Sequence, residues 1–78
     1  MSVLKKNIVG PRIREARLKH KPPLTQDELS ARLARLGVPI DRAGISKIES
    51  GTRRVSDFEL KALAVVLSLS PARLLGED

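Results

Sequence analysis

The stretch that decides the fold is DRAGISKIESG, residues 41–51, which has the signature of one short helix with a cap at each end. Asp41 can accept hydrogen bonds from the first free N–H groups, and Gly51 supplies the left-handed residue that ends a helix. Only Ile45 and Ile48 are strongly apolar, so one narrow stripe faces a core. The remaining face is displayed to the surroundings and carries side chains that can donate hydrogen bonds. A solvated surface helix is an equal interpretation of this stretch alone.

The composition describes one small domain without cysteine. Seventy-eight residues allow a single hydrophobic core. The absence of Cys excludes a disulfide framework and a thiolate site, and it fits a reducing cytoplasm. No apolar run approaches the roughly 18 residues that a membrane span needs, and the first residues lack the apolar stretch of a signal peptide. We therefore expect a cytoplasmic protein with no membrane partner.

Positive charge is concentrated in the first third of the chain. The net charge is +6, and residues 1–24 carry seven Lys or Arg against one Glu, whereas the remainder carries eight basic and eight acidic residues. Such a segment suits a polyanionic partner, either nucleic acid or an anionic membrane, although it could also be a solvated arm. Phe58 is the only aromatic residue, which disfavours membrane insertion and stacking on unpaired bases. The composition thus favours double-stranded DNA.

Apolar spacing and capping signals predict five helices and no strand. Two capping boxes, at residues 25–28 and 56–59, each begin a helix, and prolines at positions 11 and 71 open two others. We predict a flexible basic arm over residues 1–8 and a single domain over residues 9–78. The predicted helices cover residues 10–20, 26–36, 41–50, 57–67 and 71–75. On the first two helices the expected core residues are Ile13, Ala16, Leu18, Leu29, Leu33 and Leu36.

Three motifs, in this order along the chain, resemble the phage repressor and Cro type (XRE-like) of helix-turn-helix protein. They are LTQDEL at residues 24–29, ISKIESGTRR at 45–54 and ELKALA at 59–64, and the likeness spans residues 9–75. The resemblance implies an all-α, compact five-helix lambda-repressor-like domain with a helix-turn-helix. It also implies sequence-specific binding of double-stranded DNA, with the helix of residues 41–50 in the major groove.

The resemblance further implies roles for individual residues. Glu49 matches a family glutamate that pairs with an arginine of the first helix, which is Arg17 here. One of the loop residues 52–54 could instead only close the loop. The implied base contacts are Arg42, Ala43, Ser46 and Lys47, and the phosphate contacts are Gln26, Thr52, Arg53 and Arg54, with Arg12, Arg14 and the N-terminal lysines, Lys5 and Lys6, as further candidates.

The segment between Gln26 and Ile45 departs from the family pattern. It is longer by about five residues. We expect these residues to add roughly one turn to the second helix and to lengthen the connection at residues 38–40. This extra length bears on how the displayed helix docks in the groove, and so on which of its residues lies deepest.

Other classes of function have less support. One His and no Cys cannot assemble a nucleophile with a base or a metal site, so we expect no enzyme, no cofactor and no metal, and no small-molecule ligand is evident. The alternative is a protein-interaction module of the same fold, antitoxin-like or coactivator-like. We expect a small bacterial or phage transcriptional regulator, a repressor that binds as a homodimer, since one recognition helix reads few bases. Candidates for the dimer surface are Val65, Val66, Leu69 and Leu75.

Overall fold

Five α-helices and no strand make up residues 4–77, the part of the chain that the computed structural model describes. This confirms the predicted all-α helix-turn-helix fold. The observed ends agree with the predicted ones within one residue at each terminus. The helices are α1 (Gly10–Lys19), α2 (Gln26–Arg35), α3 (Arg42–Ser50), α4 (Asp57–Leu67) and α5 (Pro71–Leu74).

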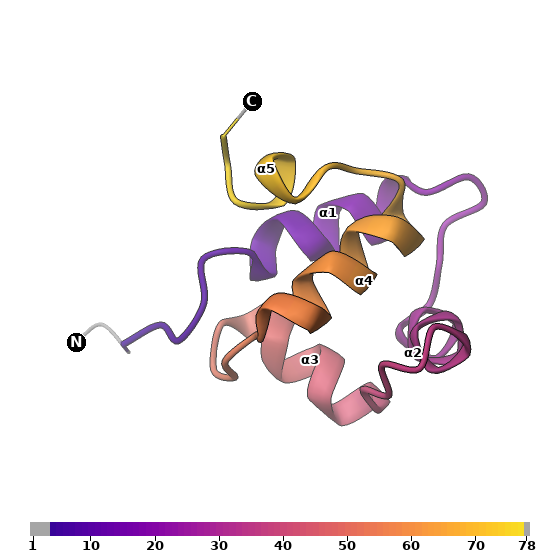
Figure 1. Cartoon of the computed structure of the whole chain (residues 1–78), viewed down its shortest axis with the longest axis horizontal. Helices are drawn as coiled ribbons and strands as arrows, with labels where there is room; N and C mark the ends of the chain where they lie inside the picture. Colours follow the sequence, from indigo (N-terminus) through magenta and orange to yellow (C-terminus); the bar gives the residue numbers. More distant parts are fainter. Residues whose placement is uncertain (1–3, 78) are drawn as a thin grey trace.

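Helix α4 lies at the centre of the arrangement and contacts α1, α2 and α5 (Figure 1). Its central position follows from its sequence, because Ala62, Leu63 and Ala64 are consecutive buried residues and Leu67 adds a fourth one turn later. Helix α3 packs on α1 and α2 and lies at the lower edge in Figure 1, opposite α5. None of the helices in residues 4–77 is long and apolar enough to cross a membrane.

Local capping fixes the ends of the helices. Both predicted capping boxes are present, at Thr25 with Glu28 and at Ser56 with Glu59. The Asp41 carboxylate accepts a hydrogen bond of 2.7 Å from the backbone N–H of Gly44 at the start of α3. An N-cap side chain stabilises a helix by about 1 kcal/mol, so these starts are set by the sequence alone.

The core draws on every helix, but two of the leucines expected in it are exposed. Leu18 is 45% exposed, because Arg17 occupies the neighbouring buried position on α1. Leu36 is 48% exposed, because α2 ends at Arg35 and Leu36 is already its C-cap. The largest fully buried side chains are Ile13, Leu29, Leu33, Ile45, Ile48, Leu63 and Leu74.

The N-terminal segment contacts the domain before α1 begins. The backbone N–H of Lys6 donates to the carbonyl of Gly51, and Asn7 donates to the carbonyls of Ile48 and Arg53. Residues 5–7, which lie in the expected flexible arm, are therefore attached to the end of α3. Residues 1–3 of that arm, and Asp78 at the other end, lie outside the described residues.

The first residue of α1 touches the backbone of α3. Gly10 is buried, and a Cβ atom placed on it would collide with the carbonyl oxygen of Ile48 and lie 2.8 Å from that of Glu49. Both neighbours are backbone atoms inside a helix, so they cannot move aside as a side chain could. This close approach explains a glycine where α1 crosses the C-terminal turn of α3.

Gly10→Ala should lower the free energy of unfolding by about 3 kcal/mol, the upper range for overpacking a rigid contact. Urea unfolding followed by circular dichroism measures the change. The matched control is Gly37→Ala, where φ is +77° and no atom lies within 4 Å of the added Cβ. That variant should lose only about 1 kcal/mol of stability, the cost of placing alanine in the left-handed region. Equal losses in the two variants would contradict the steric account.

Candidate nucleic-acid interface

Helix α3 presents a continuous polar face to solvent. Ile45, Ile48 and Glu49 are buried, and they lie on one side of the helix. The four residues predicted to contact bases fall on the opposite side, where α-helical spacing groups them with Ser50. Each of them is exposed in the structure: Arg42, Ala43, Ser46 and Lys47.

Arg42 has one weak partner on this face. Its Nη1 atom lies 3.9 Å from Oδ2 of Asp27, and both side chains are about 70% exposed, at 70% and 72%. An exposed pair at this distance contributes little to stability, at most about 1 kcal/mol. The Arg42 guanidinium can therefore leave Asp27 for another acceptor at little cost.

Glu49 is tied to Arg17 by a buried, two-pronged ion pair. Arg17 Nε lies 2.8 Å from Glu49 Oε2, and Nη2 lies 3.0 Å from Oε1. The third nitrogen, Nη1, donates to the carbonyl of Leu24, so the guanidinium joins α1, α3 and the segment before α2. The hydrogen bonds to Glu49 raise the pKa of Arg17. The negative charge of Glu49 is thereby compensated inside the fold and withdrawn from the exposed face of α3.

Gln26 joins this network. Its Nε2 atom donates to Glu49 Oε1 at 3.2 Å, and the residue is half-buried at the first position of α2. Together with Thr25, Asp27 and Arg42 it lines a shallow depression between α2 and α3. The predicted phosphate contact through Gln26 therefore starts from a side chain that is already oriented by Glu49.

The three residues predicted to contact phosphate in the loop after α3 have different surroundings. Arg53 Nη2 lies 2.9 Å from Glu59 Oε2 and Nη1 lies 3.1 Å from Oε1, so its guanidinium closes the loop onto the start of α4. The same pair lowers the pKa of Glu59, mainly through the hydrogen bonds from Arg53. Thr52 and Arg54 are exposed. The loop-closing alternative thus describes Arg53, and the other two remain accessible.

A shallow groove beside α3 collects several of these residues. Lys47, Thr52, Arg54 and also Lys6 from the N-terminal segment line it. Its two acids are engaged elsewhere, because Asp41 caps α3 and Glu59 pairs with Arg53. The groove therefore offers cations and a hydroxyl to a ligand. The sequence offered Lys6 only as one of the N-terminal lysines that could contact phosphate, because its place in this groove depends on contacts with α3.

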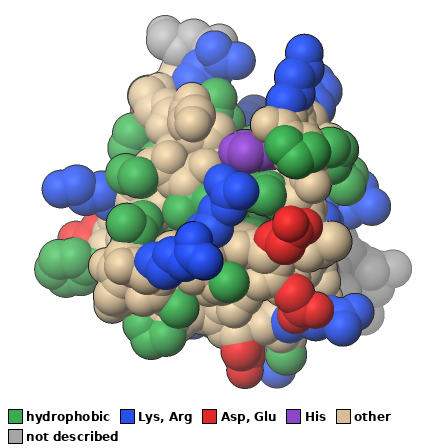
Figure 2. Space-filling model, turned by 90° about the vertical axis from the view of Figure 1, so that its right-hand side faces the viewer, with side chains coloured by type: hydrophobic (Ala, Val, Ile, Leu, Met, Phe, Trp, Pro, Cys, Tyr) green, Lys and Arg blue, Asp and Glu red, His purple; other side chains and the backbone are tan. Residues whose placement is uncertain are grey.

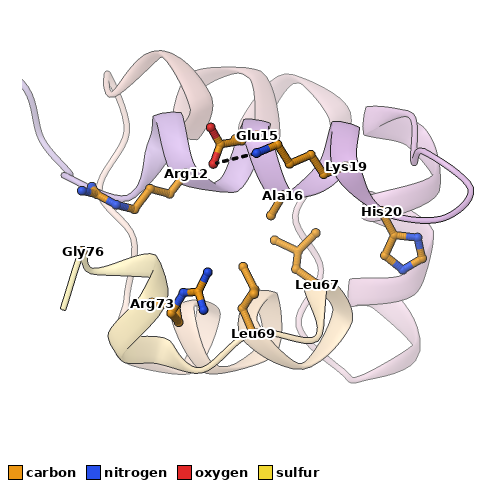
Figure 3. A pocket seen from close by; sticks show the side chains of 9 residues that line it. All are labelled: Arg12, Glu15, Ala16, Lys19, His20, Leu67, Leu69, Arg73 and Gly76. Atoms are coloured by element: carbon orange, nitrogen blue, oxygen red, sulfur yellow. Dashed lines mark ion pairs between the residues drawn. The ribbon is translucent and has the colours of Figure 1, made fainter. Parts of the chain in front are cut away.

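The two candidate arginines of α1 lie on different sides of that helix. Arg14 is exposed and follows Gly10 by one turn, on the side that approaches α3. Arg12 instead lines a pocket between α1 and α5 with Glu15, Lys19 and Arg73 (Figure 3). Helical spacing thus directs Arg14 towards the side of α3, whereas Arg12 lines the pocket between α1 and α5.

Other parts of the surface carry mixed charge. Figure 2 views the molecule from the side on which α2 lies in Figure 1, and it shows acidic, basic and hydrophobic side chains intermingled. No single-sign surface covers that face. The groove beside α3 differs from it because one of its acids caps α3 and the other pairs with Arg53.

An exposed, capped helix mounted on a preceding helix defines a helix-turn-helix protein. A family model described as helix-turn-helix matches residues 13–74, which is most of the chain. The chain belongs to the helix-turn-helix family of the phage repressor and Cro type, and its class is that of DNA-binding transcription regulators. No curated protein and no solved structure matches it significantly.

Glu49→Ala should lower the free energy of unfolding by about 3–5 kcal/mol, because Arg17 would be left buried without its counter-charge. Thermal unfolding followed by circular dichroism measures the loss. Glu15→Ala is the matched control, since Glu15 forms an exposed pair with Lys19 at 3.8 Å and should change stability by less than about 0.5 kcal/mol. A Glu49→Ala variant that melts with the parent would show that the pair does not stabilise the fold.

The Arg53–Glu59 pair should make stability depend on pH in the acid range. Because the folded-state pKa of Glu59 lies below its ordinary value of 4.5, the unfolded chain binds the proton more readily. The contribution is present above about pH 4.5 and is lost as the pH falls through the lowered folded pKa.

Urea unfolding between about pH 6 and pH 3 measures this dependence. Glu59→Gln should flatten the acid limb of the curve, and Arg53→Gln should do the same by removing the main cause of the shift. An acid limb as steep as the parent's in both variants would contradict the assignment.

Proposed function

We propose that this chain is a small bacterial or phage transcriptional regulator, a repressor, that reads double-stranded DNA in sequence-specific fashion. The observation that carries the proposal is the uninterrupted exposed face of α3, with Arg42, Ala43, Ser46 and Lys47 on it. An α-helix fits the width of the major groove, so such a face can reach base edges. The buried Arg17–Glu49 pair supports the proposal because it leaves that face without an unpaired acid.

The side chains on this face suit particular acceptors in DNA. Arg42 can donate two hydrogen bonds to O6 and N7 of guanine, and the methyl group of Ala43 can contact the methyl group of thymine. Ser46 can pair with several bases, whereas Lys47 can serve either a base or a phosphate. The combination favours a mixed sequence that contains guanine and thymine.

The proposed phosphate contacts flank this face. Thr52 and Arg54 line the groove on one side of α3, Gln26 begins α2 next to Arg42, and Arg14 is exposed on α1. Such contacts fix the register of a protein on the duplex without reading its sequence. Each neutralised phosphate should contribute about −0.9 to the slope of log affinity against log salt concentration.

We also propose that the protein acts in the cytoplasm as a homodimer on a two-fold symmetric site, because one short helix reads too few bases for useful specificity. Among the candidate surface residues, Val65 is 60% exposed and is therefore available to a second copy. Val66, Leu69 and Leu75 are partly buried against the core and offer less apolar surface.

Fluorescence anisotropy with a labelled random duplex, at low and at moderate salt, tests DNA binding. The parent should bind tightly at low salt with a steep salt dependence. The double variant Arg42→Ala, Lys47→Ala should bind about tenfold more weakly or worse, provided that circular dichroism shows it folded. The matched control is Lys19→Ala, Arg35→Ala, which removes the same two kinds of charge from exposed positions outside the proposed interface.

Three other outcomes would contradict parts of this proposal. A parent that does not bind at low salt would favour a protein-interaction module, antitoxin-like or coactivator-like. A double variant that binds like the parent would place the DNA contact elsewhere, on the basic N-terminal segment. Equal losses in the test and control variants would mean that net charge, and not the face of α3, determines affinity.

A further inference from the structure

Residues Lys5–Asn7, which we call the strap, lie across the C-terminal end of α3. The backbone N–H of Lys6 donates to the carbonyl of Gly51 at 2.8 Å, and Nζ of Lys5 donates to the carbonyl of Ser50 at 2.8 Å. The last carbonyls of an α-helix have no partner within the helix, and a nearby cation is favourable to its negative end. The strap supplies a hydrogen-bond donor and a cation to this end of α3, from a part of the chain more than 40 residues away in sequence.

Asn7 connects three segments through one side-chain amide. Its Nδ2 atom donates to the carbonyls of Ile48, at 3.1 Å, and of Arg53, at 2.8 Å. Its Oδ1 atom accepts from the backbone N–H of Gly10 at 2.8 Å. The amide is part-buried, so it links the last turn of α3, the following loop and the start of α1 with little competition from water.

The strap also determines where Lys6 lies. Because the backbone of Lys6 is bound to Gly51, its side chain lines the groove beside Lys47, Thr52 and Arg54. Lys6 itself is exposed. Two lysines, an arginine and a hydroxyl are thus gathered on one side of α3, which is the chemistry that receives a phosphate of a nucleic-acid backbone.

We propose that the strap is a working part of the DNA-binding surface, in which Asn7 is a positioning residue for α3 and Lys6 adds a phosphate contact. This inference rests on the proposed DNA binding. Asn7 acts through the backbone of α3 and of the loop, and so it fixes the orientation of side chains that it does not touch. Lys6 acts directly, through its charge.

The two roles predict different salt dependences, which anisotropy titrations of the full chain with a random duplex can separate. Lys6→Gln should lower the magnitude of the salt slope by about 0.9, because one phosphate contact is lost. Asn7→Ala should weaken binding about tenfold at a given salt concentration while the slope stays that of the parent. The matched control Lys19→Gln removes one lysine charge from the far side of α1 and should leave both quantities unchanged.

Hydrogen exchange of the free protein gives a readout that does not involve DNA. In Asn7→Ala, amides of residues 48–54 should exchange faster, whereas amides in the middle of α2 and α4 should keep the parent's rates. Asn7→Asp retains an acceptor for Gly10 but faces two carbonyl oxygens with a carboxylate, so it should resemble Asn7→Ala in this segment. If α2 and α4 exchange faster to the same extent, Asn7 stabilises the whole fold and the positioning role is wrong.

The outcomes separate this inference from the proposed function. If the parent fails to bind duplex DNA at low salt, the proposed function fails. If the parent binds and Lys6→Gln keeps the parent's slope, the phosphate contact is wrong. If the parent binds and Asn7→Ala matches its affinity, the positioning role is wrong. The Lys6 result does not depend on the folding of the Asn7 variants.

Discussion

The buried pair of Arg17 with Glu49 is the interaction on which the arrangement of the helices depends. Arg17 uses all of its side-chain nitrogens, two towards Glu49 and one towards the carbonyl of Leu24, while its own carbonyl accepts from the Leu24 N–H. One residue of α1 therefore fixes both α3 and the entry to α2. A buried ion pair adds little more stability than an apolar contact in the same place. It does require the two side chains to meet, because either charge buried alone would strongly destabilise the fold. Its effect here is to define how α1 and α3 cross.

The C-terminal end of the exposed helix, where Glu49 lies, is also held by a second set of contacts. The strap occupies the last carbonyls of α3, and the Arg53–Glu59 pair closes the following loop onto α4. Asn7 joins the two, because it binds the carbonyls of Ile48 and Arg53. The face of α3 that would meet DNA makes only weak contacts with the other helices, such as the Arg42–Asp27 pair, while its backbone is constrained on the sides that face the domain. Rigid mounting of this kind reduces the entropy lost when a helix binds a groove.

Spacing along the sequence predicted what depends on neighbouring residues, whereas among the distant contacts only the Arg17–Glu49 pair was predicted, through the family resemblance. The five helices, both capping boxes and the exposed side of α3 follow from spacing over a few residues, and the structure contains them. Leu18 and Leu36 fit an apolar pattern yet are exposed, because burial is decided by which side of a helix meets a neighbour. The same limit applies to Arg12 and Arg14, which look equivalent in sequence but face different sides of α1. Asn7 gave no local signal, and Lys6 gave only its charge, since their partners follow more than 40 residues later.

The connection between α2 and α3 explains how extra length can be accommodated without loosening α3. Between the end of α2 at Arg35 and the cap at Asp41, Ile40 is buried in the core and its carbonyl accepts a hydrogen bond of 2.6 Å from the Ser30 hydroxyl. The connection is anchored a second time at Val38, which packs against the core and whose N–H donates to the carbonyl of Leu33 at 3.1 Å, so little of it is free to move. The contact between Ser30 and Ile40 thus helps to fix α3 relative to α2, together with the Arg17–Glu49 pair. Variation in length can thus be confined to the exposed corner, away from the face that the helix presents.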